Sequence, residues 1–430
     1  MNLMRVPKVF YGWWIVLTAF ITMVLSIGSY FSFGVFFKEL LKEFSLSRAE
    51  LSAVQSIQGV LAILIIPLIG RWIDSYGPRR AMMIGMVLLG ICFILLSRLN
   101  ALWQLYIIYV FIAVGLVATG PLPISKVISC WFDRRRGMAL SFAFLGTEFG
   151  GFLLVPLSNH LISQFGWRIS YFILGLLIWV ITLPALNWLM KDSPEEMGLQ
   201  PDGEKQLVGI EGGTNPPPSA LFSVTERSFS PSEAIRTINF WLFSFAFFLL
   251  GMGIVFLFSH MVPFLTDKGL TAKTAAFILS LLFGFSAVGK IGMGFISDKY
   301  DTRYTMILIC LIISTGMLIL WTMESTLMTY IGSIIFGLGM GGMPVIRTII
   351  IRENFGLIHF TEISGYIMVA MAIGSAISPF GAGYIFDITG SYSIAFLSGM
   401  TAAFLAAMAI FFAQPPKLKF VPSGSHAISD

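Results

Sequence analysis

Twelve separate apolar runs, each about the length of a membrane-crossing helix, constrain this chain more than any other feature. An α-helix rises about 1.5 Å per residue, so about 20 residues cross the roughly 30 Å hydrocarbon core of a bilayer. Charged residues make up 11% of the 430 residues, against about 25% in soluble domains. The sequence therefore predicts an all-α integral membrane protein with twelve transmembrane helices. The runs are Phe10 to Phe37, Leu51 to Ile69, Ala81 to Leu96, Trp103 to Trp131, Met138 to Ser163, Ile169 to Met190, Ile238 to Leu265, Thr271 to Ile296, Thr305 to Met323, Tyr330 to Ile351, Ile363 to Phe386 and Ile394 to Phe412.

The distribution of basic residues predicts the orientation of these spans. An even number of spans puts both ends of the chain on one side. With that side taken as cytoplasmic, seventeen of the 27 Lys and Arg residues lie inside and seven outside, as the positive-inside rule requires. We therefore expect a multi-pass protein of the plasma (inner) membrane with both termini cytoplasmic. Because the basic residues form short clusters between spans, the net charge of +5 does not indicate a nucleic-acid partner.

The longest connection between spans divides the chain into two halves of six spans each. It runs from residue 191 to 236 and contains Pro216, Pro217 and Pro218 beside Gly212 and Gly213, a composition typical of a flexible linker. We expect an N-terminal bundle at 1–190, a cytoplasmic linker at 191–236, a C-terminal bundle at 237–414 and a cytoplasmic tail at 415–430.

The two halves also repeat each other in sequence. Four groups of residues recur at an offset of 221 to 224. Such repeats are typical of transporters that hold their substrate at the repeat interface. The halves are therefore predicted to form two pseudo-symmetric six-helix bundles around a central cavity. The groups are Gly70, Asp74 and Arg79 with Gly294, Asp298 and Arg303; Gly120, Pro123 and Lys126 with Gly341, Pro344 and Arg347; Gly151 and Pro156 with Gly374 and Pro379; and Gly166 and Phe172 with Gly390 and Phe396.

The first of these groups lies in a loop pattern that resembles the major facilitator superfamily. The stretch Gly70-Arg-Trp-Ile-Asp74-Ser-Tyr-Gly77-Pro-Arg79-Arg80 matches the superfamily pattern G-x-x-x-D-x-x-G-x-R-[KR] at every fixed position. The resemblance implies the superfamily's fold and a conformational latch, in which a carboxylate pairs with arginines at a helix end. The expected latch residues are Gly70, Asp74, Gly77, Arg79, Arg80, Gly294, Asp298 and Arg303.

Five further stretches resemble the monocarboxylate transporter and oxalate/formate antiporter group of that superfamily. They are Tyr11-Gly-Trp-Trp14, Val35-Phe-Phe-Lys-Glu39, Trp131-Phe-Asp-Arg-Arg-Arg-Gly-Met-Ala-Leu140, Ser193-Pro-Glu-Glu-Met-Gly-Leu-Gln-Pro-Asp-Gly203 and His260-Met-Val-Pro-Phe-Leu-Thr-Asp267. The resemblance implies that Lys290 binds a substrate carboxylate, because monocarboxylate transporters have an arginine at this position. The chain differs from the mammalian members at Ser286, where they carry an aspartate, and at Phe31, where they carry a lysine. These two positions are candidate substrate contacts.

Charged side chains in mid-span are costly and are functional candidates by default. Three basic residues lie inside the predicted spans: Lys126, Lys290 and Arg347. Lys290 and Arg347 are predicted to bind the substrate anion, although each of the three long side chains is also able to reach the membrane surface. Lys290 is a candidate for proton coupling as well, since an ammonium loses its proton more readily when buried.

Glu148 is the acidic residue deepest in a predicted span, between Gly146 and Gly150 of the fifth run. One interpretation pairs it with Lys126 on the fourth span. The other makes it a proton carrier, because burial favours the neutral form of a carboxyl group. His260 lies near the outer end of the seventh span and is either a proton-coupling group or a hydrogen-bonded interface residue.

Tyr30 and Tyr366 lie on spans that line the cavity in the superfamily. Each offers a hydroxyl on an apolar ring, and the alternative interpretation is simple packing. They complete the predicted substrate-binding set.

Together these features predict a secondary active transporter that moves a small organic anion, a monocarboxylate, by alternating access coupled to protons. The alternative is an exporter of a larger amphipathic or aromatic compound, which would depend on Phe31 and Glu148 more than on Lys290. A receptor or sensor of transporter ancestry is also open. We expect a functional monomer in the lipid bilayer, with no enzyme activity, cofactor or metal, since the four histidines are scattered and no nucleotide-binding glycine loop occurs.

Overall fold

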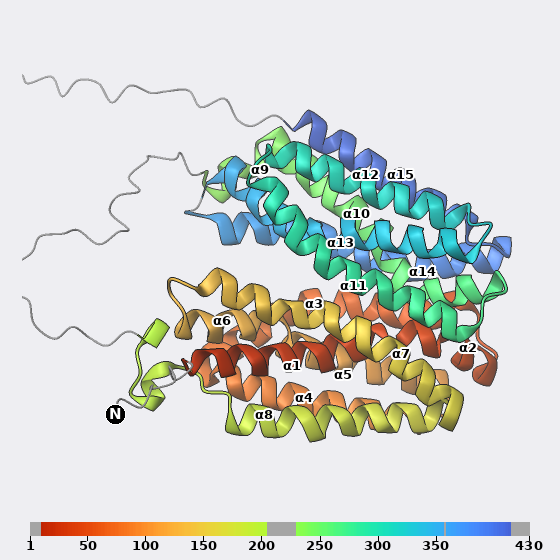
Figure 1. The fold of residues 1–430 in the computed structure, drawn as a ribbon, viewed down its shortest axis with the longest axis horizontal. Coiled ribbons are helices and arrows are strands. Elements are labelled where there is room, and N and C mark those ends of the chain that lie inside the picture. The colour runs from red at the N-terminus through yellow and green to blue at the C-terminus, as the bar shows by residue number, and fades with distance from the viewer. Residues whose placement is uncertain (1–9, 204–228, 357, 414–430) are drawn as a thin grey trace, which may run out of the picture.

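The computed structural model describes residues 10–203, 229–356 and 358–413, and these residues form two helical bundles side by side (Figure 1). In the described part of the chain, eleven helical stretches are long and apolar enough to cross a membrane. One of them, Arg136–Trp188, has 53 residues and is broken at Gly166, where φ is +76°. Because this stretch turns back on itself at the glycine, it makes two spans, and the predicted twelve are confirmed.

The N-terminal half contains eight α-helices and a π-helical turn at Ile178–Thr182. The helices are α1 (Gly12–Phe31), α2 (Phe33–Phe44), α3 (Arg48–Tyr76), α4 (Pro78–Leu96), α5 (Leu102–Thr119), α6 (Pro121–Trp131), α7 (Arg136–Leu177) and α8 (Leu183–Trp188).

The C-terminal half contains one short helix and six long ones. They are α9 (Pro231–Ile235), α10 (Ile238–Asp267), α11 (Ala272–Ser297), α12 (Thr302–Trp321), α13 (Thr326–Phe355), α14 (Phe360–Thr389) and α15 (Ser393–Phe412). Of the predicted linker and ends, residues 1–9, 204–228 and 414–430 lie outside the described part of the chain.

Two spans that the sequence predicts as continuous runs are each made of two helices. The fourth span breaks at Gly120 between α5 and α6, because Pro121 has no N–H to continue the α5 ladder and instead starts a new helix. The first span breaks at Ser32 between α1 and α2. The Ser32 hydroxyl donates back to the Gly28 carbonyl at 3.3 Å, a contact that bends helices.

Each half has an apolar core of its own, and glycines bring the helices of each half together in the same way. A Cβ on Gly150 of α7 would meet the Val24 carbonyl of α1. A Cβ on Gly374 of α14 would likewise overlap the Phe248 carbonyl of α10. Small residues that allow backbones to approach are typical of membrane interfaces. The packing therefore repeats at Gly150 and Gly374, whereas Gly151, the residue matched with Gly374 in the sequence, faces the Phe283 ring of α11.

The two halves meet along three helix pairs: α3 with α14, α7 with α11, and α2 with α10. We call the end of the bundle that carries residues 45–47, 268–271 and 390–392 the distal end. The opposite end carries the linker and is called the linker end, on the left of Figure 1. These names locate the charged side chains described next.

Candidate functional site

Lys290 on α11 and Glu148 on α7 form an ion pair that joins the two halves in mid-span. Lys290 Nζ lies 2.6 Å from Glu148 Oε1, and the two side chains are 16% and 9% exposed. The second carboxylate oxygen, Oε2, is buried and has no hydrogen-bond partner among the described residues. Two of the predicted coupling residues are thus each other's partner across the interface.

The predicted pairing of Glu148 with Lys126 is wrong. Lys126 Nζ instead lies 2.7 Å from Asp74 Oδ1 and donates to the Ile73 carbonyl at 3.2 Å. The reason is the break at Gly120, after which α6 carries Lys126 beside the last turn of α3 at the linker end. Glu148, halfway along α7, is left to face α11.

Close packing of α11 against α13 fixes the backbone that carries Lys290. A Cβ on Gly341 would overlap the Ser286 carbonyl and lie 2.9 Å from the Lys290 nitrogen. Ser286 itself is fully buried, one helical turn before Lys290, and its hydroxyl has no hydrogen-bond partner within the described ranges. Ser286, which the sequence predicts as a substrate contact, therefore has an unpaired hydroxyl one turn from the ion pair.

Arg347 is a half-buried cation on α13 that lies closer to the linker end. Its Nη1 lies 3.1 Å from the sulfur of Met371, and no carboxylate of residues 10–203, 229–356 or 358–413 comes within 4.0 Å of its nitrogens. Met371 occupies the repeat position of Glu148, which explains why the second half lacks an acid here. Among the described residues, Lys290 thus has an acidic partner and Arg347 has none.

The predicted aromatic contacts fall in different places. Phe31 packs with Phe258 and Phe283, with ring centroids 5.0 and 4.5 Å away, on the distal side of Lys290. Tyr30 donates to Gln58 Oε1 at 3.0 Å. Tyr366 is 43% exposed near the start of α14 and donates to Glu362 one turn earlier, away from Phe31 and its neighbours. Phe258 and Phe283 also contact each other, with ring centroids 5.5 Å apart, so the three rings form one cluster.

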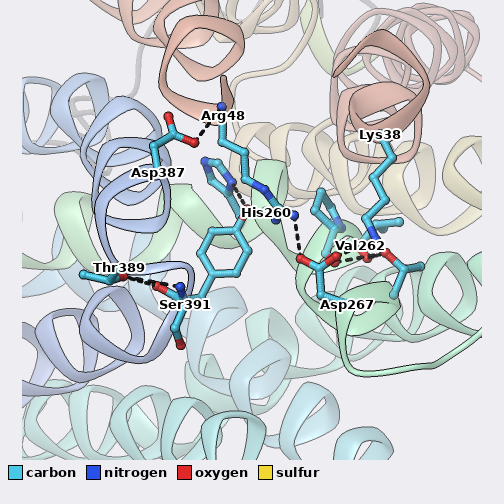
Figure 2. A network of polar contacts seen from close by, with 11 residues as sticks. Lys38, Arg48, His260, Val262, Asp267, Asp387, Thr389 and Ser391 are labelled. Carbon is cyan, nitrogen blue, oxygen red and sulfur yellow. Dashed lines mark hydrogen bonds and ion pairs between the residues drawn. The ribbon is translucent and has the colours of Figure 1, made fainter. Parts of the chain in front are cut away.

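His260 is fully buried in a polar network at the distal end (Figure 2). Its Nε2 lies 3.0 Å from the Pro379 carbonyl and 3.0 Å from Ser52 Oγ, and its Nδ1 lies 2.8 Å from the Tyr392 hydroxyl. A carbonyl only accepts, so Nε2 carries a hydrogen, and in a neutral ring Nδ1 then accepts from Tyr392. Burial raises the pKa of the Tyr392 hydroxyl above its ordinary value, which keeps this donor protonated. Both ring nitrogens of His260 thus have hydrogen-bond partners in this network.

Four charged residues at the same end join the halves, and the sequence did not single them out. Asp267 on α10 lies 2.6 Å from Lys38 Nζ and 2.6 Å from Arg48 Nη2. Asp387 on α14 accepts from the Arg48 and Ala49 backbone N–H groups, at 3.0 and 2.7 Å. Figure 2 shows Arg48 between the two carboxylates. Their position in the sequence could have identified two of them. Lys38 and Asp267 each lie at the distal end of a span, in stretches that resemble the monocarboxylate transporter group.

Comparison with known sequences decides the family. The sequence model of the Major Facilitator Superfamily matches residues 19–357 and again 286–428. This chain belongs to the Major Facilitator Superfamily. It is therefore a membrane transport protein and not an enzyme.

Similar members of the superfamily carry monocarboxylate transporter names. The chain is 25% identical to monocarboxylate transporter 13 of Bos taurus over 404 residues, which are 92% of this chain and 87% of that protein. It is also 25% identical to monocarboxylate transporter 2 of Homo sapiens over 402 residues, covering 90% and 82%. Among solved structures, a bacterial homolog of the human lysosomal transporter Spinster, in an inward-facing and unoccupied conformation, matches with a TM-score of 0.72 at 16% identity, covering 95% of this chain and 98% of that one.

The superfamily loop residues make contacts inside their own halves. Arg79 donates to the Leu186 and Asn187 carbonyls at 3.2 and 2.6 Å, at the end of the sixth span. Arg303 donates to the Ile410 carbonyl at 3.1 Å, at the end of the twelfth. The two arginines thus repeat one another. Asp74 differs from the expectation, because it pairs with a lysine and not with an arginine.

The start of the linker is folded onto the first of these loops. Asp192 Oδ1 accepts from the Arg79 backbone N–H at 2.7 Å and so caps α4, beside Gly77, whose φ is +88°. A Cβ on Gly77 would lie 2.6 Å from Asp192 Oδ2. Burial raises the pKa of Asp192 above its ordinary value, since desolvation outweighs the hydrogen bond from Arg79. A glycine at position 77 therefore leaves room for the Asp192 carboxylate that caps α4.

Proposed function

We propose that this transporter moves a small organic anion, a monocarboxylate, together with a proton by alternating access between the two bundles. The observation that carries the proposal is the ion pair of Lys290 with Glu148, which lies across the interface in mid-span. A cation there attracts a carboxylate, and an acid beside it is positioned to take up a proton. The names of the similar transporters support the same substrate class.

The coupling follows from the exchange of one carboxylate for another. A substrate carboxylate replaces Glu148 on Lys290, and Glu148 is then left buried without a counter-ion. An unpaired buried charge is costly, so Glu148 takes up a proton when the substrate binds. When the substrate leaves, Lys290 returns to Glu148 and displaces that proton. One carboxylate and one proton therefore cross together, without net charge.

Arg347 supplies the remaining charge of the site. With Glu148 ionised, Lys290 and Glu148 cancel, and Arg347 leaves the mid-span region with one positive charge. This positive charge attracts the anion, and it is unchanged when one carboxylate and one proton bind together. The unpaired Ser286 hydroxyl, one turn from Lys290, offers a further donor to the substrate.

We further propose that the protein lies in the plasma (inner) membrane with both termini cytoplasmic. The distribution of Lys and Arg supports this orientation. In it, the distal end faces outwards, and the contacts of Asp267 and Asp387 hold the outer side closed. The protein is expected to work as a monomer, because the site lies between the two halves of one chain.

Uptake into proteoliposomes tests the proposal. A panel of labelled carboxylates, such as pyruvate, lactate, oxalate and succinate, is offered with and without an inward proton gradient. We expect the gradient to accelerate uptake of monocarboxylates, and Lys290→Gln to abolish uptake. Lys273→Gln on the exposed start of α11 is the matched control and should transport normally.

Two results would contradict the proposal. Carboxylate flux that is indifferent to Lys290→Gln would show that the anion binds elsewhere. No flux of any carboxylate, with export of bulky aromatic compounds, would favour the exporter interpretation, for which the packed rings of Phe31, Phe258 and Phe283 are the nearest feature.

A further inference from the structure

The distal end contains a carboxylate held by two cations, and its members come from opposite halves. Asp267 of the C-terminal half places Oδ1 2.6 Å from Lys38 Nζ and Oδ2 2.6 Å from Arg48 Nη2. Each oxygen therefore has its own cation, which is the arrangement that a free carboxylate group would use. Figure 2 shows Lys38 and Arg48 approaching Asp267 from two sides.

The four charged residues that meet across the interface at this end are divided by sign between the halves, although Glu39, Glu43 and Glu50 of the N-terminal half and Lys268 and Lys273 of the C-terminal half also lie near this end. Lys38 on α2 and Arg48 at the start of α3 belong to the N-terminal half, joined by a short connection. Asp267 and Asp387 belong to the C-terminal half. Alternating access requires the halves to separate at this end, which takes both carboxylates away together. The two cations then face the opening without their acidic partner.

We infer that Lys38 and Arg48 form a second carboxylate site, which receives the substrate at the distal end before it reaches Lys290. Asp267 occupies this site when the distal end is closed. The inference rests on the proposed function, because it assumes that the substrate is a carboxylate. The ligand is a single carboxylate group bound by one ammonium and one guanidinium, so no particular tail is selected there.

Competition between the substrate and Asp267 follows from this arrangement. While an anion sits on Lys38 and Arg48, Asp267 has no partner and the distal end stays open. Closure proceeds once the anion moves inward to Lys290. The side chain of Arg48 is 12% exposed in the closed state and its guanidinium lies 3.6 Å from the Phe386 ring centroid, so part of its contact surface also changes with opening.

Two substitutions that break the same ion pair separate this inference from a purely structural clasp. Lys38→Gln removes a cation of the site, whereas Asp267→Asn removes the competitor and leaves both cations in place. If the contact only holds the halves closed, both variants should change the KM of uptake in the same direction. If the cations receive substrate, Lys38→Gln should raise the KM roughly threefold to fivefold, the effect of one partly exposed ion pair, and Asp267→Asn should lower it.

The measurement is the initial rate of uptake of the best-transported carboxylate of the panel, in inside-out and right-side-out vesicles. We expect the opposite changes in KM only in vesicles that present the distal end to the substrate. Lys42→Gln is the control, because it removes an exposed charge one turn further along α2.

Two failures are distinguishable. The second site alone would be overturned if the unmodified protein transports normally but the KM of Lys38→Gln equals that of Lys42→Gln. The same conclusion would follow if the KM of Lys38→Gln and the KM of Asp267→Asn change in the same direction. Absence of carboxylate flux in the unmodified protein would overturn the proposed function, and the second site with it.

Discussion

Removing Lys290 should destabilise the protein in a way that depends on pH. In Lys290→Gln, Glu148 keeps its buried position, with its side chain 9% exposed and Oε2 already without a partner. Breaking a buried pair by removing one partner costs about 3 to 5 kcal/mol, because the other charge is left uncompensated. Glu148 limits this cost, since it can take up a proton instead of remaining charged.

The destabilisation of Lys290→Gln cannot exceed the free energy needed to protonate the Glu148 carboxyl group. For a glutamate with an ordinary pKa of about 4.3, that free energy is about 3.7 kcal/mol at pH 7, at about 1.36 kcal/mol per pH unit. At pH 5.5 it falls to about 1.6 kcal/mol by the same relation. The destabilisation is therefore present above the ordinary pKa of glutamate and shrinks as the pH falls towards it.

Thermal unfolding of purified protein in detergent measures this effect. The reference is the double variant Glu148→Gln with Lys290→Gln, which has neither charge and keeps the side-chain volumes. We expect the difference in melting temperature between the single and the double variant to shrink by about half from pH 7 to pH 5.5. Equal melting temperatures at pH 7, or a difference that does not change with pH, would refute the assignment of Glu148 as an uncompensated acid.

Two further predictions concern the backbone that supports the site. Gly341→Ala should destabilise the protein by roughly 1 to 3 kcal/mol and reduce uptake, because the added Cβ would overlap the Ser286 carbonyl. Gly292→Ala is the control, since its Cβ would meet nothing within 4 Å, and it should be neutral or stabilising. Thermal unfolding compares the two variants. Asp192→Ala should lower the free energy of unfolding by about 1 kcal/mol, because α4 loses its cap. Asp192→Asn should cost less, since its side-chain oxygen can still accept from the Arg79 N–H. Equal falls in melting temperature for the two variants would contradict the capping role.

The sequence predicted the spans well because each span is a local property. Twelve apolar runs predicted twelve membrane spans, and the offset of 221 to 224 between repeated residues predicted two similar halves. The breaks at Ser32 and Gly120 were not predicted, because a hydropathy pattern does not register a change of helix direction inside an apolar run. Gly166 was more visible, since a glycine between two runs is the expected place for a turn.

The sequence predicted which charged residues belong to the candidate site, but not which of them form ion pairs. Mid-span charge identified Lys290, Arg347 and Glu148, yet the partner of Glu148 depends on how one bundle lies against the other. A single sequence contains no signal for that contact, and the neighbouring span suggested Lys126 instead. Asp267 was missed for a related reason, because at a span end it reads as an ordinary solvated residue until Lys38 and Arg48 are placed beside it.

The most direct test of the account measures proton and carboxylate flux together in Glu148→Gln. In proteoliposomes, a pH-sensitive dye records proton movement while a labelled monocarboxylate records substrate movement. We predict that the unmodified protein carries one proton per carboxylate, and that Glu148→Gln still exchanges labelled for unlabelled substrate but no longer responds to a proton gradient. Glu324→Gln, an exposed acid, should behave like the unmodified protein. Accumulation of substrate by Glu148→Gln under a proton gradient would contradict the central claim that this carboxylate carries the proton.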